Sequence, residues 1–426
     1  MSWPIVTLGA LAAPHKGSIT DGPFGSNLAR QHYRDSGPRV VRLQNIGDGV
    51  FIDNPAHIDH EHFTTLRRHE VIAGDLLVAS LGEVLPRACL MPAGLGPAIV
   101  KADCIRVRLR DDVDPRWVNY SLQRPATRKW AEGRRHGVGR PRLGLKGIRE
   151  IPIPLPSLRD QRRFVEILED HLSHLDAGQA SLRNADVRMN GLVASRINSL
   201  LDTADGQEVA LGTLAQSVRN GIFVSRASTE PTGVPILRIG AVRPLALNLS
   251  DLRYSGRGAS DLMASDALLD PGDLLFTRYN GNPRFVGASA VVDRRLLPLT
   301  YPDKLIRVRV DQARAIPEFV CYATNFGRGR RQIDAKLKTS AGQVGISGGE
   351  LKTISIGIPR LEIQQGVVDR VQKILDARSR LKSGLEKSLS RSEDLRRAVL
   401  SSAFEGKLTG RSADQEVIES VADVQR

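Results

Sequence analysis

The chain has 426 residues and a mass of 46.6 kDa, which is enough for several domains with cores of their own. Hydrophobic residues make up 41% and charged residues 25%, as in soluble globular proteins, and no apolar run approaches the about 18 residues of a membrane span. The first residues do not resemble a secretion signal, and the 3 cysteines are scattered without CxxC spacing. We therefore expect a cytoplasmic protein without disulfides, membrane segments or a zinc site.

The charge points to a polyanionic partner. The chain carries 61 basic and 47 acidic residues, a net charge of +14, and a nucleic acid is the commonest partner of so basic a protein. Arginine supplies 49 of the 61 cations, and its guanidinium binds phosphates and guanine edges in a bidentate manner. A coding bias toward arginine accounts for the arginine excess equally well, but it does not by itself explain the net charge.

The sequence contains a tandem repeat. Five short segments recur in the same order at offsets of 198 to 203 residues, which indicates a tandem duplication of a whole domain and its connector. The matching pairs are 6–11 and 209–214, 73–77 and 271–275, 105–109 and 306–310, 115–118 and 317–320, and 151–158 and 354–361.

Each copy begins with about 150 residues of mixed pattern, for which we predict an α+β fold. In copy one, residues 40–44, 75–80 and 104–110 read as strands, and residues 117–130 read as a helix that starts after Asp114 and Pro115. A proline-rich run at 151–156 ends this part.

A long helix follows in each copy. Apolar residues recur at alternating steps of three and four over about four heptads, which predicts helices at 162–202 and 365–404 and favours their pairing as a coiled coil. The predicted seam of the first helix is Leu168, His171, Leu175, Gly178, Leu182, Ala185, Met189 and Leu192. The equivalent positions of the second are Val371, Ile374, Arg378, Leu381, Leu385, Ser388, Ser392, Leu395 and Val399. Two ordinary amphipathic helices, each packed on its own domain, remain an alternative.

The charge follows this division. We predict domains at 1–150 and 204–353, helical spacers at 151–203 and 354–410, and a tail at 411–426. The two domains carry net charges of +7 and +6, whereas the first spacer carries −1 and the remaining residues +2. This distribution favours two DNA-binding modules separated by a nearly neutral spacer.

Several motifs resemble one family. They are the run at 153–161 that leads into the long helix, its counterpart at 358–364, the segment 402–408, and the Asp-Gly-Pro-Phe-Gly-Ser-Asn-Leu run at 21–28. On these motifs the chain resembles the specificity (S) subunit of type I restriction-modification systems over nearly its whole length. Copy two has a different sequence, residues 220–225, in place of the run at 21–28, so its domain should read different bases.

The resemblance implies an architecture and a set of partners. Two target-recognition domains would each read half of a split site in double-stranded DNA, and two helical regions would pack as an antiparallel coiled coil and dock two methyltransferase subunits. A translocase-nuclease (R) subunit is a further family partner, whose presence the sequence leaves open. An autonomous DNA-binding regulator made of two fused domains is the alternative function.

Catalytic motifs are missing from the sequence. It has no P-loop and no Asn-Pro-Pro-aromatic motif, and residues 21–24 carry glycine where that motif has its first proline. His57, His60 and His62 are spaced too irregularly for a zinc helix, and we expect them in a solvated loop. We therefore predict a non-catalytic chain with no cofactor and no metal.

Three clusters are the candidate DNA contacts: a glycine-punctuated basic loop in copy one, its counterpart in copy two, and a polar turn at 278–284. Glycine lets the backbone approach DNA, while arginine, lysine and asparagine reach phosphates and base edges. A solvated charged surface is the alternative for the basic loops, and an ordinary hairpin is the alternative for the turn. The candidates are Arg134, Arg135, Arg140, Arg142, Lys146, Arg278, Asn280, Arg284, Arg330, Arg331, Lys336 and Lys338.

Overall fold

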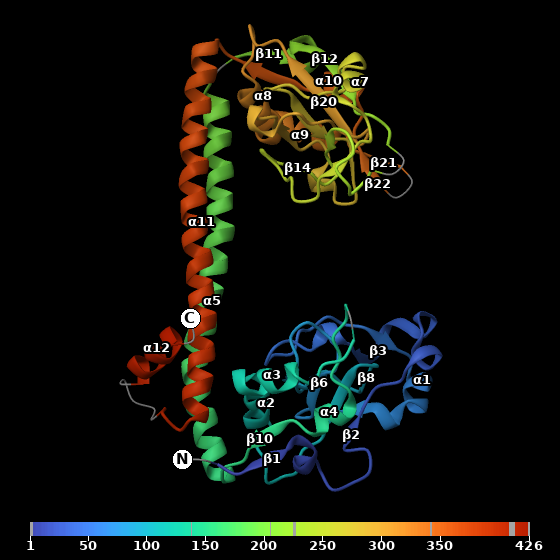
Figure 1. Cartoon of the computed structure of the whole chain (residues 1–426), viewed down its shortest axis with the longest axis vertical. Coiled ribbons are helices and arrows are strands. Elements are labelled where there is room, and N and C mark those ends of the chain that lie inside the picture. Colours follow the sequence, from blue (N-terminus) through green and yellow to red (C-terminus); the bar gives the residue numbers. More distant parts are fainter. Residues whose placement is uncertain are drawn as a thin grey trace. The chain divides into compact units, whose positions relative to one another are not determined.

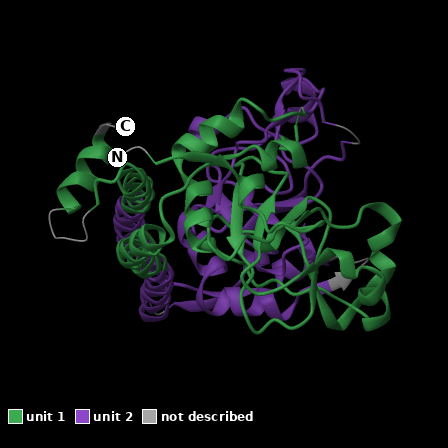
Figure 2. Ribbon diagram, turned by 90° about the horizontal axis from the view of Figure 1, so that it is seen from below, with its two compact units in different colours: residues 1–183, 386–426 green, residues 184–385 purple. Residues whose placement is uncertain are grey.

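A computed structural model describes residues 3–137, 139–204, 206–224, 227–340, 343–408 and 414–424. The chain forms two compact units: unit 1 holds residues 1–183 and 386–426, and unit 2 holds residues 184–385 (Figure 2). Each unit combines a mixed helix and strand domain with segments of two long helices (Figure 1).

An antiparallel four-stranded sheet, in the order β2-β9-β6-β7, forms the centre of unit 1. Its strands β6 and β9 are buried over their whole length, and Leu76 and Val107 pack in one core with Trp117 of helix α2 (Pro115–Gln123). The strands are β2 (Ile19–Thr20), β6 (Leu76–Ala79), β7 (Arg87–Leu90) and β9 (Cys104–Val107).

The remaining elements of the unit 1 domain surround this sheet. A second sheet, in the order β4-β3-β8-β5, contains β3 (Tyr33–Val41), β4 (His57–Ile58), β5 (Glu70–Val71) and β8 (Ala98–Val100). The α-helices are α1 (His60–Thr65), α2 (Pro115–Gln123), α3 (Pro125–Glu132) and α4 (Leu145–Arg149). The 3-10 helices are η1 (Leu8–Leu11), η2 (Gly25–Leu28), η3 (Arg30–His32), η4 (Leu43–Asn45) and η5 (Arg67–His69).

Unit 2 has the same kind of central sheet, in the order β12-β20-β17-β19. Its strands are β12 (Ala215–Asn220), β17 (Leu274–Thr277), β19 (Ser289–Val291) and β20 (Leu305–Val310). Shorter pairs are β13 (Pro235–Ile236) with β16 (Arg253–Tyr254), and β14 (Val242–Arg243) with β15 (Ala246–Leu247). A three-stranded ribbon joins β18 (Tyr279–Asn280), β21 (Lys338–Ser340) and β22 (Gln343–Gly345). The helices are α6 (Leu211–Leu214), α7 (Ala259–Ala264), α8 (Pro317–Asn325), α9 (Gly327–Ala335), α10 (Gly348–Lys352), η6 (Pro283–Phe285) and η7 (Arg294–Leu296).

The strand registers match between the units. Ile19 of β2 faces Val107 of β9, and Val218 of β12 faces Val308 of β20, so the central sheets are built from equivalent residues. The first and last repeated segments of each copy also pair with each other: β1 (Ile5–Thr7) with β10 (Pro152–Pro154), and β11 (Gln207–Ala210) with β23 (Ser355–Ile358). Each globular domain is thus closed by its two ends, as a duplication requires.

The helix predicted at 117–130 is wrong in one respect, because the chain forms two helices there. Asp114 caps α2 by accepting a hydrogen bond from the backbone of Arg116, as the Asp-Pro start predicts. Pro125 then ends α2 and opens α3, because proline disfavours a helical residue before it but suits the first turn of a new helix.

A buried glutamine fixes each domain to the start of its long helix, α5 (Leu158–Thr203) or α11 (Leu361–Phe404). The side-chain oxygen of Gln161 accepts a hydrogen bond from the backbone N–H of Asp114 at 2.9 Å, and its amide donates to the carbonyl of Pro156 at 3.0 Å. In unit 2, Gln364 accepts from the backbone of Ile316 at 2.8 Å and donates to carbonyls on both sides of the junction. Both glutamines lie in the motifs that carry the family resemblance.

The long helices pair within each unit. In unit 1, Gln179 donates to Ser392 at 3.1 Å, and Asp176 accepts from Arg396 at 2.9 Å, so the two helices run in opposite directions. In unit 2, Arg378 donates to Asn190 at 2.9 Å. The last helix, α12 (Asp414–Val424), packs against the unit 1 core through Ile418 and Ala422. The predicted α+β domains in tandem and antiparallel pairing of the long helices are confirmed.

The seam is displaced from the predicted one at several positions. Leu192 is 71% exposed and Leu381 is 61% exposed, whereas Val193 and Ile197 pack into the unit 2 core. In unit 1, Leu172 is buried where the heptad pattern predicts His171. A heptad repeat drifts by about 20° per heptad against the 3.6-residue turn, so by Leu192 the inward position has moved on by one residue. Leu172 follows the buried Leu168 by four residues, which also places both on one face of the helix.

Candidate nucleic-acid interface

The basic loop of copy one is a hairpin. Residues 134–137 and 139–142, here called the basic hairpin, are closed by two backbone hydrogen bonds of 3.0 and 2.9 Å between His136 and Arg142; Val138 lies outside the described residues. Gly137 and Gly139 have φ angles of +98° and +81°, a conformation that glycine adopts without strain, so the turn depends on these residues.

The basic hairpin stands on the loop between β6 and β7. The backbone N–H of Gly82 donates to Pro141 at 3.1 Å, that of Leu143 donates to Ser80 at 2.8 Å, and Leu81 forms a β-bridge with Arg142. The hairpin is therefore a continuation of the central sheet and has a defined position in unit 1.

The arginine side chains of the basic hairpin differ in the contacts that hold them. Arg134 lies 4.3 Å over the ring of Trp130, Arg135 donates to the carbonyl of Glu83 at 2.9 Å, and Arg142 pairs with Asp103 at 3.0 Å. Arg140 is exposed, and the described residues offer it no ion-pair partner. Lys146 lies on α4, outside the hairpin, where it is exposed and 4.0 Å from Glu150.

Unit 2 has the same element in an extended form. Tyr279 faces Gly345, and Gly345 faces Lys338, in the β18-β22-β21 ribbon. In unit 1 the corresponding bridges join Leu81 to Arg142 and Arg142 to His136. The basic hairpin and the β21–β22 hairpin are therefore equivalent, and each is joined to the loop that follows the equivalent sheet strand of its copy, β6 or β17.

The ribbon brings together two clusters that are separate in the sequence. Arg278 donates to the carbonyl of Asp303 at 3.3 Å and lies 4.9 Å over the ring of Tyr279, while Asn280 accepts a hydrogen bond from the backbone of Asn282. Lys338, on the neighbouring hairpin, pairs with Glu350 at 2.6 Å. That pairing lowers the pKa of Glu350 to about 2, so the carboxylate stays charged and offsets part of the Lys338 charge.

The other unit 2 candidates lie beside the ribbon. Arg284 is exposed in η6, and Arg331 is exposed on α9. Arg330 donates to the carbonyl of Val286 at 2.9 Å and pairs with Asp334, so its guanidinium holds α9 against the segment after η6. Lys336 is half-buried at the C-terminal end of α9. No observation on the twelve candidate residues tests DNA contact, and they stay predictions.

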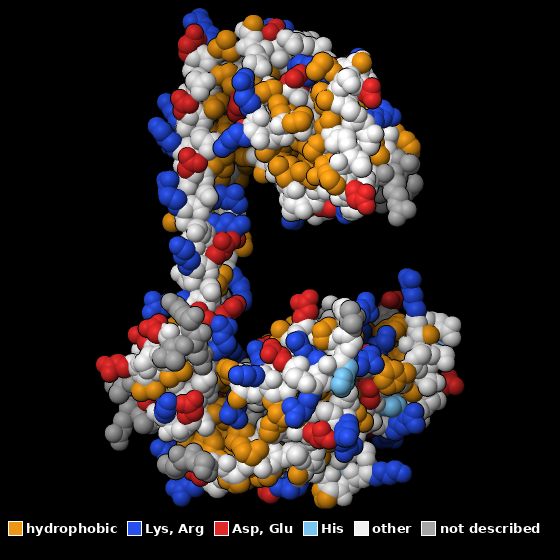
Figure 3. All heavy atoms as spheres, viewed as in Figure 1, with side chains coloured by type: hydrophobic (Ala, Val, Ile, Leu, Met, Phe, Trp, Pro, Cys, Tyr) orange, Lys and Arg blue, Asp and Glu red, His pale blue; other side chains and the backbone are white. Residues whose placement is uncertain are grey.

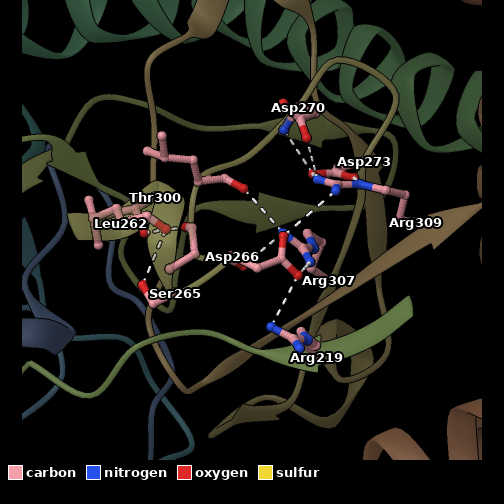
Figure 4. A network of polar contacts seen from close by, with 11 residues as sticks. Arg219, Leu262, Ser265, Asp266, Asp270, Asp273, Thr300, Arg307 and Arg309 are labelled. Carbon is pink, nitrogen blue, oxygen red and sulfur yellow. Dashed lines mark hydrogen bonds and ion pairs between the residues drawn. The ribbon is translucent and has the colours of Figure 1, made fainter. Parts of the chain in front are cut away.

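A different set of arginines forms hydrogen bonds and ion pairs with aspartates inside each unit. Two aspartates are almost fully buried. Asp75 accepts two hydrogen bonds from Arg108, and Asp273 accepts two from Arg309. Figure 4 shows the unit 2 network, in which Asp266 lies between Arg219 and Arg307, at 3.1 and 2.6 Å. The hydrogen bond from Arg307 is the main cause that lowers the pKa of Asp266. These arginines are held by carboxylates of the fold, so they are not candidates for binding a partner.

On the face that Figure 3 shows, the basic side chains of the described residues form no continuous field. Figure 3 shows Lys and Arg side chains interspersed with acidic and apolar ones on the visible face of each domain. On this face, recognition of a polyanion would therefore depend on individual basic side chains more than on a single charged surface.

The described residues contain no group of three or more His, Cys, Asp or Glu side chains arranged to hold a metal ion. His57 and His62 bond to backbone carbonyls, those of Gly37 at 2.7 Å and Asn27 at 2.8 Å. In the described part of the chain, no helix is long and apolar enough to cross a membrane.

Comparisons with known proteins fit this arrangement, although no family model matches the chain. The chain is 30% identical over 273 residues to the type I restriction enzyme EcoKI specificity subunit of Escherichia coli (strain K12), which covers 61% of this chain and 58% of that relative. The StySPI specificity subunit of Salmonella potsdam is 26% identical over 271 residues, with the same coverage of 61% and 58%. The chain is a relative of the type I specificity subunits. It spans 58% of the length of these curated relatives.

A solved structure supports the fold of this specificity-subunit relative. A chain from a study of the complex assembly and conformational transition of the type I R-M system matches with a TM-score of 0.67 and 17% identity, and the match covers 96% of this chain and 98% of that one. The family resemblance predicted from the sequence is confirmed.

Sequence reasoning missed the loop between β6 and β7 in this specificity-subunit relative. Residues 80–86 carry no cluster of basic side chains, yet they hold the basic hairpin at the place where residues 278–284 hold the unit 2 ribbon. The repeat offset of 198 between residues 73–77 and 271–275 aligns the two loops and is the signal that could have found them.

Proposed function

We propose that the chain is the DNA-specificity subunit of a type I restriction-modification complex. Each domain reads one half of a bipartite site in double-stranded DNA, and the long helices dock two methyltransferase subunits. The observation that carries this proposal is the paired element: an equivalent hairpin on a strand-end loop occurs at the same place in both units, with four arginines in unit 1 and Lys338 in unit 2. Two equivalent frames with different side chains suit two different half-sites.

The loops beneath the hairpins supply that difference. Unit 1 presents Ser80-Leu81-Gly82-Glu83, whereas unit 2 presents Arg278-Tyr279-Asn280-Gly281 on an equivalent backbone. Arginine and asparagine make bidentate contacts with guanine and adenine, respectively, and the unit 1 loop has neither. The two domains therefore read unlike sequences.

Exposed apolar side chains support docking on the long helices. Leu192 of α5 is 71% exposed in unit 2. Its repeat equivalent in unit 1, Leu395, is half-buried and packs against a core that includes Ile418 of α12. Leu192 is thus an exposed apolar residue whose equivalent in the other copy is partly covered, and a partner helix would bury it favourably.

Purification of the tagged full chain from its native host tests the proposal. We expect a methyltransferase subunit at about two copies per chain, and Leu192→Asp should lower that ratio while the exposed neighbour Ser195→Asp should not. Recovery of a chain that binds DNA by itself, with no methyltransferase, would instead support an autonomous regulator. A translocase-nuclease subunit in the same preparation would identify the larger restriction complex.

Catalysis belongs, in this proposal, to the partners. The purified chain should neither methylate nor cleave duplex DNA when supplied with S-adenosylmethionine, ATP and Mg²⁺. Methylation by rigorously pure chain would contradict this part of the proposal.

A further inference from the structure

Among the described residues, only two aromatic side chains are exposed. The chain has 10 Phe, 6 Tyr and 3 Trp, all within the described ranges. Phe24 is 52% exposed and Phe223 is 73% exposed, while the other aromatic side chains are buried or half-buried. Scattered exposed apolar side chains are ordinary, so the significance of these two depends on where they lie.

Both lie at the same place in the repeat. Phe24 follows β2 and Phe223 follows β12, the first strands of the two central sheets, whose registers against β9 and β20 are equivalent. Each phenylalanine comes two residues after a glycine, Gly22 or Gly221. The rest of the segment differs between the copies, so the glycine and the exposed ring are what the two loops share.

The glycines hold the loops against the backbone. A Cβ on Gly22 would lie 2.2 Å from the carbonyl carbon of Lys101, and a Cβ on Gly221 would lie 2.2 Å from the carbonyl oxygen of Tyr301. No other residue fits at these distances without moving the backbone. Each loop therefore has a fixed course that leaves its phenylalanine ring in solvent.

The loops are tied to the basic hairpin and the ribbon through an aspartate in the turn before β9 or β20. In unit 1, Asp21 accepts a hydrogen bond from the backbone of Asp103 at 2.9 Å, and Asp103 pairs with Arg142 of the basic hairpin at 3.0 Å. In unit 2, the backbone of Asp303 donates to Ile222 at 2.9 Å, and its carbonyl accepts from Arg278 of the ribbon at 3.3 Å. The segments that carry the exposed rings are thus linked to the elements that carry candidate DNA contacts.

We propose that Phe24 and Phe223 contact bases directly, each ring inserting as an apolar wedge at one base step of the half-site that its own unit reads. The inference rests on the proposed function and adds a residue of defined role to each domain. Apolar wedges beside basic side chains are a known means of unstacking a base step, and the ring leaves water when it inserts. The basic side chains linked to these segments, Arg142 in unit 1 and Arg278 in unit 2, favour DNA over a protein partner as the surface that covers the rings.

The test uses the full chain in complex with the methyltransferase subunit that copurifies with it, and a library of random-sequence DNA duplexes. Phe24→Ala should weaken binding to the selected sequence at least about fivefold, because loss of one contact between a base and an aromatic ring typically lowers affinity by this much or more. It should also reduce the base preference in one half-site only. Phe223→Ala should do the same in the other half-site. Phe24→Leu, which keeps an apolar wedge, should retain most of the preference.

Two controls separate the wedge from a structural role. Val50→Ala and Met263→Ala remove exposed apolar side chains elsewhere in the two units and should leave the selected sequence unchanged. Permanganate should modify a thymine at the wedged step in the wild-type complex and lose that reactivity in the alanine variant of the same unit.

Two outcomes would overturn the inference. One is a pair of alanine variants that keep the wild-type affinity, sequence and permanganate pattern, and the other is a pair whose only defect is loss of the methyltransferase. A wild-type complex that selects no bipartite sequence would contradict the proposed function itself and remove the basis of the inference with it.

Discussion

Gln161 should contribute disproportionately to the stability of unit 1. The side chain is 1% exposed, and its two hydrogen bonds satisfy the backbone N–H of Asp114 and the carbonyl of Pro156. Gln161→Leu keeps the volume but leaves both backbone groups buried without a partner. At about 1–3 kcal/mol for each unsatisfied group, the free energy of unfolding of unit 1 should fall by about 2–6 kcal/mol.

Tryptophan fluorescence gives a selective assay, because all 3 tryptophans, Trp3, Trp117 and Trp130, lie in unit 1. With a denaturant dependence of about 1–3 kcal/mol per molar urea, the fluorescence midpoint should drop by about 1 M or more. The control is Gln415→Leu in the same unit, an exposed glutamine that bonds only to the Glu419 side chain among the described residues, which should change stability by less than about 0.5 kcal/mol.

The equivalent change in unit 2 completes the experiment. Gln364→Leu leaves three backbone groups unsatisfied, but unit 2 has no tryptophan, so its loss of stability should be seen by circular dichroism with little shift of the fluorescence midpoint. If Gln161→Leu unfolds at the same urea concentration as Gln415→Leu, the buried glutamine does not hold the junction and the reasoning is refuted.

Further predictions concern charge and thiols. Replacing the four arginines of the basic hairpin with alanine should reduce the log–log salt dependence of DNA binding by about 0.9 for each phosphate that the hairpin no longer neutralises, and an unchanged slope would place the hairpin in solvent. Because Arg307 lowers the pKa of Asp266, the carboxylate stabilises unit 2 above about pH 4, its ordinary range, and this contribution disappears as the pH falls through the lowered value. Asp266→Asn should therefore remove part of the acid-induced loss of stability measured by circular dichroism. If the variant and the wild type lose stability equally as the pH falls, this prediction is contradicted. Burial raises the pKa of Cys89 and Cys321 to about 12, so iodoacetamide should label these thiols at pH 8 only after unfolding, and rapid labelling of the native chain would show that they are accessible.

The duplication is the most reliable information in the sequence. The repeated segments 6–11 and 151–158 each contain part of a strand, and these two strands, β1 and β10, pair with each other. They are repeated together because each domain is closed by the pairing of its two ends. The offset also aligns loops that share little sequence. Repetition does not supply local geometry: Pro125 divides a helix that apolar spacing alone joins.

The candidate interface is predictable in part. Clusters of arginine and glycine identify the basic hairpin, but not that Arg330 is held by Asp334 or that Lys338 faces Glu350, since those partners are set by helix and strand packing. The seam shows the same limit. Heptad counting assigns Leu192 inward, whereas Val193 takes the inward position because the helix turns by 3.6 residues and not 3.5.

The central claim is that the two domains read two unlike half-sites of one DNA sequence. Genome-wide mapping of methylated positions in cells that express the chain with its copurifying methyltransferase tests this most directly. The account predicts one motif made of two short, different half-sites around a spacer in which any base is accepted, and exchange of residues 278–284 should change one half-site only. A continuous motif, or a change in both half-sites after that exchange, would contradict the account.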